Sequence, residues 1–357
     1  MLKVNPMRPN IAIIGAGITG VMTALACARE GASVDLYDAG AIPNPKNLSW
    51  AYGRLWKHAH ENNAMLQPLA AYSRNYWHTL IGGVNSTFGC HTQSFRVVDN
   101  VTCQHLTQLY ESLDIGFDVQ EPDASVLSQQ LNISSPDKLL FIGDDAMLLD
   151  ARKIYAYLCH EMEENPGISL KPFHRVDLST IQDGKSLLIQ GERKYYTTVI
   201  CTTGTPIAEH NSDPLSRPVS QYQVHLDVHL NDDQTPLFGP VLTMGDSNYS
   251  WCVPSPDRRV LKVSASRFSY PTPPDSSHQL ACKAYLLDQL RISYDKVRLY
   301  VSPYFEIPSA ARQKQAYWRE HNTAGCLIIE ACDASVFKIA PALSQQLCRY
   351  AIHGVKE

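Results

Sequence analysis

The sequence has no long apolar run, no Cys-x-x-Cys pair and no excess of charge of either sign. Because no eighteen apolar residues run together, we expect no membrane-spanning helix. The polar, proline-interrupted start of the chain does not resemble a secretion signal. A net charge of −4 gives no reason to expect nucleic acid or an anionic membrane as a partner. We therefore expect a cytoplasmic protein without membrane insertion or nucleic-acid binding.

The ten cysteines stand at irregular spacings, which do not match a metal site. We expect them to be free, mostly buried thiols in a reducing compartment. At 357 residues, of which 44% are apolar, the chain has ample material for a core but is long for a single one. Two packed domains are the better expectation.

Three consecutive segments near the start have the pattern of a βαβ unit. Residues 10–14 are a short apolar run, which favours a buried parallel strand. Residues 18–29 carry apolar side chains at helical spacing and end before Gly31, a suitable residue after a helix. Residues 32–38 alternate into a second strand. Strand, helix and strand in this order predict an open, Rossmann-like α/β sheet.

The turn between the first strand and the helix has the sequence G-x-G-x-x-G. Gly15 permits a tight turn, Gly17 lets the backbone approach a pyrophosphate, and Gly20 lets helix and strand pack closely. The phosphates would lie at the helix N-terminus, near the N–H groups of Ile18 and Thr19, because the helix dipole favours anions there.

Asp38 ends the second strand, where a carboxylate can accept both hydroxyls of a ribose. The glycines alone are a weak signal, and a glycine turn without a ligand is the plain alternative. With both strands and Asp38, the pattern predicts a dinucleotide-binding domain. It does not separate NAD from FAD.

The second half of the chain changes to strands joined by Pro, Asp and Asn turns. Helices are expected over residues 63–81, 104–113, 150–158, 276–290 and 340–352. Further strands are expected over residues 94–98, 169–171, 186–189, 195–201, 221–230, 241–244, 249–253, 259–266 and 326–329. We therefore expect an α/β fold whose second domain is α+β.

Five short segments stand in order along the chain: residues 49–59 (SWAYGRLWKHA), 174–176 (HRV), 199–204 (VICTTG), 259–263 (RVLKV) and 337–341 (FKIAP). In this order and spacing the chain resembles the FAD-dependent D-amino-acid oxidase superfamily, and most of all monomeric sarcosine oxidase and the N-methyl amino acid oxidases. The first segment resembles the one that carries two basic residues beside the flavin ring. The last resembles a loop that lies along the flavin pyrimidine before the final helix.

The resemblance implies a discontinuous FAD-binding domain of residues 1–81, 144–217 and 318–357. It implies an antiparallel-β substrate-binding domain of residues 82–143 and 218–317. The implied cofactor-binding residues are Gly15, Gly17, Ile18, Thr19, Gly20, Asp38, Ser49, Arg54, Val176, Gly204, Asp333, Val336, Phe337 and Lys338. The implied catalytic residues are Lys262, Arg54, Lys57, Lys338 and Trp251.

The activity that the resemblance implies is oxidation of the C–N bond of a small amine or amino acid, by hydride transfer to flavin N5. Lys57 and Lys338 match positions that hold a substrate carboxylate, and a lysine there offers a point charge where arginine would grip bidentately. Arg54 would favour negative charge on the reduced ring. Lys262 would promote electron transfer to dioxygen. Trp251 stands where the family often has a substrate-facing tyrosine.

Each of these side chains also has a plain structural interpretation, as a solvated lysine or a core aromatic. The chain departs from the family at residues 331–336, which replace a glycine-rich loop with a histidine, and at Ser266, which replaces a second active-site histidine. Residues 311–314 offer no cysteine for covalent attachment, so non-covalent FAD is expected. Three hypotheses stay open: an oxidase that uses O2, a dehydrogenase with another electron acceptor, and a flavin-binding partner protein whose catalytic site has decayed.

Overall fold

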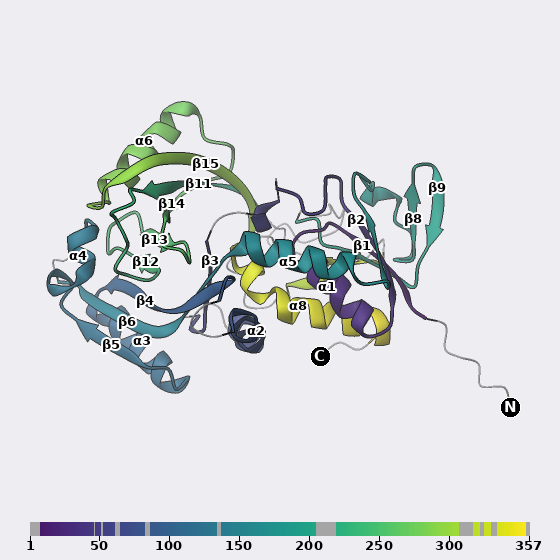
Figure 1. The fold of residues 1–357 in the computed structure, drawn as a ribbon, viewed down its shortest axis with the longest axis horizontal. Coiled ribbons are helices and arrows are strands. Elements are labelled where there is room, and N and C mark those ends of the chain that lie inside the picture. Colours follow the sequence, from purple (N-terminus) through teal and green to yellow (C-terminus); the bar gives the residue numbers. More distant parts are fainter. Residues whose placement is uncertain are drawn as a thin grey trace. The chain divides into compact units, whose positions relative to one another are not determined.

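The computed structural model describes residues 8–45, 47–50, 53–60, 65–82, 86–133, 137–204, 219–306, 317–321, 325–329 and 334–354 (Figure 1). The chain divides into two compact units. The first unit comprises Met1–Trp50, Ile154–Val219 and Phe305–Glu357, and the second comprises Ala51–Lys153 and Ser220–Tyr304. Among the described helices, none is both long and apolar enough to cross a membrane.

The first unit is built on a six-stranded sheet with the order β16-β17-β10-β1-β2-β7. Its strands are β1 (Asn10–Ile14), β2 (Ser33–Tyr37), β7 (Ile168–Lys171), β10 (Thr198–Cys201), β16 (Trp318–Glu320) and β17 (Leu327–Ile329). All neighbours are parallel except β16 and β17. Four of the five residues of β1 are buried, as expected for a central strand of a parallel sheet.

Helix α1 (Ile18–Arg29) connects β1 to β2, so the predicted βαβ unit is confirmed. Helix α1 packs against α8 (Ala334–His353), which closes the unit (Figure 1). The unit also contains most of α5 (Ala151–Glu163), the short helices η1 (Leu48–Trp50) and η3 (Leu178–Thr180), and a hairpin of β8 (Ser186–Ile189) and β9 (Glu192–Tyr195).

The last helix begins six residues earlier than the sequence pattern predicts. Residues 336–338, expected in a loop before this helix, lie within its first two turns. No glycine or proline stands between residues 331 and 340 to end a helix, and Pro341 follows inside it. The expectation of a loop at residues 336–338 is therefore wrong.

The second unit is built on a nine-stranded sheet with the order β15-β11-β14-β13-β12-β4-β6-β3, in which β5 also pairs with β6. Its strands are β3 (Arg54–Lys57), β4 (Gly89–Val98), β5 (Phe117–Gln120), β6 (Leu139–Leu149), β11 (Val219–Leu230), β12 (Val241–Thr243), β13 (Ser250–Pro254), β14 (Val260–Tyr270) and β15 (Tyr294–Glu306). Its helices are α2 (Leu66–Ile81), α3 (Asn100–Ser112), η2 (Pro122–Ala124), α4 (Val126–Gln130) and α6 (Ser276–Asp288).

The boundaries of these units differ from the expected domain boundaries in four segments. Residues 218–219 and 305–317, expected in the substrate-binding domain, group with the first unit. Residues 51–81 and 144–153, expected in the FAD-binding domain, group with the second unit. The backbone explains this grouping, because β3 forms its ladder with β6 and β6 forms the next one with β4. These hydrogen bonds join both segments to the second sheet.

Candidate functional site

The glycine turn after β1 is closed by contacts that only glycine permits. Gly15 has a φ of +102°, and a Cβ there would lie 2.8 Å from the carbonyl oxygen of Thr202. A Cβ on Gly20 would lie 1.9 Å from the carbonyl oxygen of Gly15. The Thr202 hydroxyl, just beyond β10, donates to that same oxygen at 2.7 Å. Gly204 follows with a φ of +67°. The turns after β1 and β10 are therefore packed together.

Gly17 differs, because it meets only side chains. A Cβ at this position would lie 3.3 Å from the Asn47 amide nitrogen and 3.7 Å from the Ser49 hydroxyl oxygen. A methyl group would thus fit against the protein, so packing within the protein does not require glycine. The need for glycine at this position is explained by a ligand that approaches the backbone.

The N-terminus of α1 has no acidic residue in its first turn, which leaves its positive end available to an anion. One of the expected phosphate donors is already used, since the Ile18 N–H donates to the Ser49 hydroxyl at 2.9 Å. Thr19 is buried, and its carbonyl accepts the Thr23 hydroxyl at 2.7 Å. Ser49 therefore lies directly against the helix end as a positioning residue.

Asp38 is anchored beside this turn by its own carboxylate. One oxygen accepts the Ala16 N–H at 2.9 Å, and the other accepts the Gly40 N–H at 2.7 Å and the Asn44 amide at 3.3 Å. A carboxylate offers about four lone-pair positions. Three protein donors therefore leave capacity for a hydroxyl group of a ribose.

The segment after β7 lies next to Asp38. The His174 N–H donates to the Asp38 carbonyl at 2.8 Å, and Val176 is buried in the apolar cluster that contains Tyr37. Both lie beyond the carboxyl ends of parallel strands, which is where an open α/β sheet binds its ligand. The first unit thus brings Gly15, Gly17, Ile18, Thr19, Gly20, Asp38, Ser49, Val176 and Gly204 to one edge of its sheet.

The remaining expected cofactor residues of the first unit lie on α8 or directly before it in the sequence. Val336 and Phe337 are buried, and Lys338 is half-buried. Asp333 lies outside the described residues.

In the second unit, β11 separates apolar from polar side chains with a period of two. Val224, Leu226 and Val228 are fully buried in the apolar core. His225, Asp227 and His229 alternate with them, and so leave the strand on the other face. Neither His225 nor Asp227 was expected from the sequence, although this alternation was the signal that could have revealed them.

Cross-strand pairs extend this polar face. Asp227 lies opposite Lys262 of β14, and Lys262 lies opposite Val253 of β13. Two residues further along β14, Ser264 lies opposite His225 of β11 on one side and Trp251 of β13 on the other. The His225 ring also stacks on Tyr300 of β15, with centroids 5.3 Å apart. The polar face therefore holds two expected residues, Lys262 and Trp251.

The titratable groups on this face have shifted pKa values. Burial and the charge of Arg54 lower the pKa of Lys262 to about 7, while Asp227 opposes the shift. Burial, Lys262 and Arg54 hold the pKa of His225 far below its usual range, so its ring is neutral. Burial raises the pKa of Asp227, against the effect of Lys262. Among the described residues, Oδ1 of Asp227 has no hydrogen-bond partner.

Arg54 and Lys57 stand at opposite ends of β3, which pairs regularly with β6. Side chains alternate along a strand, so residues three apart leave it on opposite faces. Arg54 acts electrostatically on Lys262 and His225. Arg54 and Lys57 therefore leave β3 on opposite faces, and the expectation that both lie beside the flavin ring stays a prediction.

The residues of the first unit fit a dinucleotide, since the glycine turn, the helix end and Asp38 supply what a pyrophosphate and a ribose require. Within the described ranges, no group of three His, Cys, Asp or Glu side chains is placed to hold a metal ion. Fold and site together define a dinucleotide-dependent α/β protein with a half-buried lysine on a separate polar sheet face.

Residues 10–295 match the family described as DAO, FAD dependent oxidoreductase. This match spans most of the sequence, so the chain belongs to that family. The protein is an FAD-dependent oxidoreductase, and FAD is its cofactor.

Solved structures with the same fold cover nearly the whole chain. NikD, an unusual amino acid oxidase essential for nikkomycin biosynthesis, has a TM-score of 0.74 at 15% identity, over 98% of this chain and 95% of that chain. Glycine oxidase from Geobacillus kaustophilus has a TM-score of 0.74 at 14% identity, over 98% and 95%. L-proline dehydrogenase from P. horikoshii has a TM-score of 0.73 at 13% identity, over 99% and 95%. At these identities the likeness concerns the fold alone.

The sequence similarity to a curated protein covers only a short segment. The probable electron transfer flavoprotein-quinone oxidoreductase YgcN of Escherichia coli (strain K12) is 56% identical over 50 residues. These residues are 14% of this chain and 11% of YgcN. The chain therefore matches only about a tenth of the length of this relative.

Proposed function

We propose that this protein oxidises the C–N bond of a small amine or amino acid and passes the electrons to dioxygen. When bound, FAD would supply the two-electron redox chemistry, as the acceptor of a hydride equivalent from the α-carbon of the substrate. The amine loses a proton and becomes an imine, which water hydrolyses to a carbonyl compound and a released amine or ammonia. Dioxygen then takes two electrons and two protons and leaves as hydrogen peroxide.

The first unit would hold the cofactor non-covalently. The N-terminus of α1 would take the pyrophosphate, Asp38 the ribose, and the segment from His174 to Val176 the adenine. Val336, Phe337 and Lys338 on α8, and Asp333 before it, would complete the flavin site. These assignments follow from the resemblance and from where the described residues lie.

The proposal of catalysis rests on the polar face of the second unit. Its key observation is Lys262, a half-buried lysine beside Arg54 with a pKa near 7. A protonated lysine with few water molecules around it stabilises negative charge that develops on dioxygen. Trp251 would bound the substrate, and Arg54 would attract an anionic group. A role for Lys57 stays a prediction, because it leaves β3 on the other face.

The names of the neighbours support the substrate class. Two are oxidases of amino acids and one is a dehydrogenase of L-proline. They share the fold with this chain at low identity, so the acceptor and the substrate require measurement.

The test is reduction and reoxidation of the purified flavoprotein. Anaerobic addition of primary amines and of D-, L- and N-methyl amino acids should bleach the visible flavin band with one of them, and air should restore it with release of hydrogen peroxide. Lys262→Met should slow the restoration by at least tenfold and leave the bleaching rate within about threefold. Lys296→Met, which removes an exposed lysine of the same sheet, should change neither.

Two outcomes would contradict the proposal. Bleaching followed by slow reoxidation in air would show a dehydrogenase with another acceptor. A yellow protein that no amine bleaches would favour a flavin-binding partner without catalysis.

A further inference from the structure

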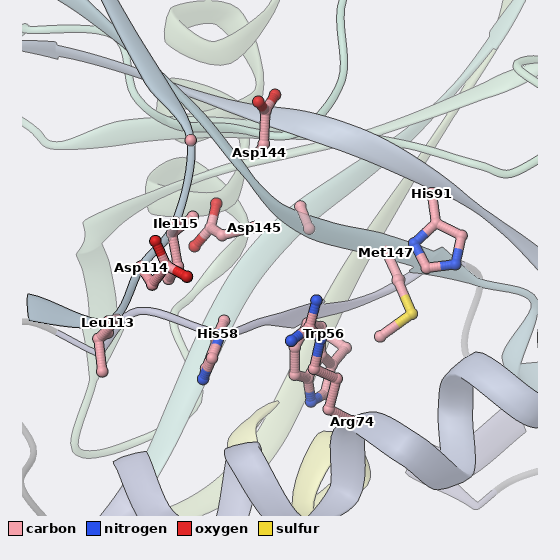
Figure 2. Close-up of a pocket in the computed structure, with 12 residues that line it drawn as sticks. Trp56, His58, Arg74, His91, Leu113, Asp114, Ile115, Asp144, Asp145 and Met147 are labelled. Atoms are coloured by element: carbon pink, nitrogen blue, oxygen red, sulfur yellow. The ribbon is translucent and has the colours of Figure 1, made fainter. Parts of the chain in front are cut away.

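A cavity of about 210 Å³ lies in the second unit (Figure 2). It is formed by β3, β4, β6, α2 and the turn between α3 and β5, and its lining includes no residue of the polar face around Lys262. A water molecule in the liquid takes about 30 Å³, so the cavity holds a ligand of only a few heavy atoms.

Three basic side chains from three elements line this cavity: Arg74 of α2, His58 just after β3, and His91 of β4. Within the part of the chain that the structure describes, no carboxylate pairs with Arg74 and no hydrogen bond reaches the ring nitrogens of His58 or His91. The ring of His78 lies 4.9 Å from that of His91. Basic groups therefore gather here without a protein acceptor.

Burial and repulsion from neighbouring positive charge lower the pKa of both histidines. Burial first, and then the charge of Arg74, lowers the pKa of His58, while the charge of Asp145 opposes this shift. Burial, His78 and Arg74 lower the pKa of His91 in the same way. A negatively charged ligand between these groups would relieve this repulsion.

The nearest buried carboxylate does not serve this purpose, because it is already satisfied. Asp145 lies 3.8 Å from the Arg96 guanidinium and accepts the Ser94 hydroxyl at 2.5 Å and the Ala59 N–H at 3.3 Å. The positive side of the cavity therefore needs an acceptor from outside the chain.

The opposite side of the cavity is acidic. Figure 2 shows Asp114 on the other side of the cavity from Arg74, whereas the Asp144 carboxylate points away from Arg74; both residues are exposed at the rim. Asp144 has one oxygen occupied by the Gln93 amide at 2.8 Å. Between the two sides lie Met147 and Trp56, which stacks on His58 with centroids 5.9 Å apart. The lining therefore offers one cation and two imidazole rings at one end, carboxylates at the other and an apolar floor.

We propose that this cavity binds a small zwitterionic amino acid, with its carboxylate on Arg74, His58 and His91 and its ammonium group toward Asp114. A dicarboxylate or a phosphate would meet the acidic rim, and a simple amine would meet the arginine. The cavity favours a ligand with both charges, separated by one or two carbon atoms.

The test is calorimetric titration of the full chain with glycine, acetate, methylammonium and phosphate, together with the imidazole NMR signals of His58 and His91. Glycine should bind more tightly than the other three and should shift both signals. Arg74→Gln and Asp114→Asn should each weaken glycine binding at least tenfold. Arg29→Gln, which removes an exposed arginine of α1, should leave it unchanged.

Acetate or phosphate binding as tight as that of glycine would overturn the assignment to a zwitterion. Unmoved signals of His58 and His91, or glycine binding unaffected by Arg74→Gln, would overturn the site itself. None of these measurements uses the colour or turnover of the flavin. Failure here is therefore distinguishable from failure of the proposed oxidation.

Discussion

The charge of Asp227 should set the pH at which Lys262 acts. The two residues are cross-strand neighbours, and Asp227 is the group that opposes the lowering of the pKa of Lys262. Asp227→Asn keeps the shape of the side chain and removes its charge. The protonated form of Lys262 then loses a stabilising neighbour, so its pKa should fall below about 7.

The size of this shift follows from the strand geometry. Directly opposed side chains have Cβ atoms about 5 Å apart. Two unit charges about 6 Å apart interact by about 3 kcal/mol at an effective dielectric constant of about 20, which corresponds to about 2 pH units. Lys262 is only half-buried, so solvent screening reduces the expected shift to about 1 unit. At pH 7 the protonated fraction would then fall about fivefold.

The assay is stopped-flow reoxidation of the anaerobically reduced protein between pH 5.5 and 9. The fast, lysine-dependent phase should be present below the pKa and be lost as the pH rises through it. We expect its midpoint near pH 7 in the parent protein and near pH 6 in Asp227→Asn. Asp233→Asn, an exposed aspartate just after β11, is the matched control. A midpoint that stays in place, or moves to higher pH, would refute the reasoning.

Three further predictions concern stability and cofactor binding. Gly20→Ala should lower the free energy of unfolding by about 3 kcal/mol, because the added Cβ would overlap a backbone oxygen. Gly17→Ala should change the free energy of unfolding by less than about 1 kcal/mol and still lower the FAD content. Thermal unfolding checks the stabilities, and the ratio of flavin to protein absorbance checks the FAD content. Equal unfolding temperatures of the two variants would contradict these predictions. Ser49→Ala removes the acceptor at the helix end and should cost about 1 kcal/mol, with Ser49→Thr as the conservative control. Arg96→Met strands the fully buried Asp145 carboxylate and should cost about 3–5 kcal/mol in urea unfolding; adding Asp145→Leu should recover part of this loss, and no recovery would argue against a charge effect.

The first unit was largely predictable because its signals are local. An apolar run, three glycines at fixed spacing and Asp38 define β1, α1 and β2 within 38 residues of sequence. Helix α8 was placed too far along the chain: it was expected over residues 340–352, while it begins at Ala334 and carries Pro341 inside it.

The strands that were missed lack a clean alternation. In β6 the run Gly143-Asp144-Asp145 interrupts the apolar pattern, and Asp145 is buried only because Arg96 lies on the neighbouring strand β4. Strand β15 contains Pro303 and many polar residues, which an edge strand tolerates. In both cases a partner distant in sequence decides the structure.

The candidate site was predictable only in part, for the same reason. Positions in the glycine turn follow from spacing within one segment. Lys262 interacts electrostatically with Arg54 and Asp227, and the three residues lie on strands that are far apart in the chain. No local sequence pattern encodes such an interaction. The resemblance supplied Arg54 and Lys262, but Asp227 required the register between β11 and β14.

The order of strands in the first sheet has a consequence for how the protein is made. Strand β1 lies between β2 and β10, and β10 pairs with β17, which is more than 300 residues from β1 in the chain. Translation at about 5–20 residues per second separates their emergence from the ribosome by tens of seconds. During this time an apolar edge of the nascent sheet stays uncovered. We expect this unit to fold late, to need protection from aggregation, and to load its cofactor only after synthesis is nearly finished.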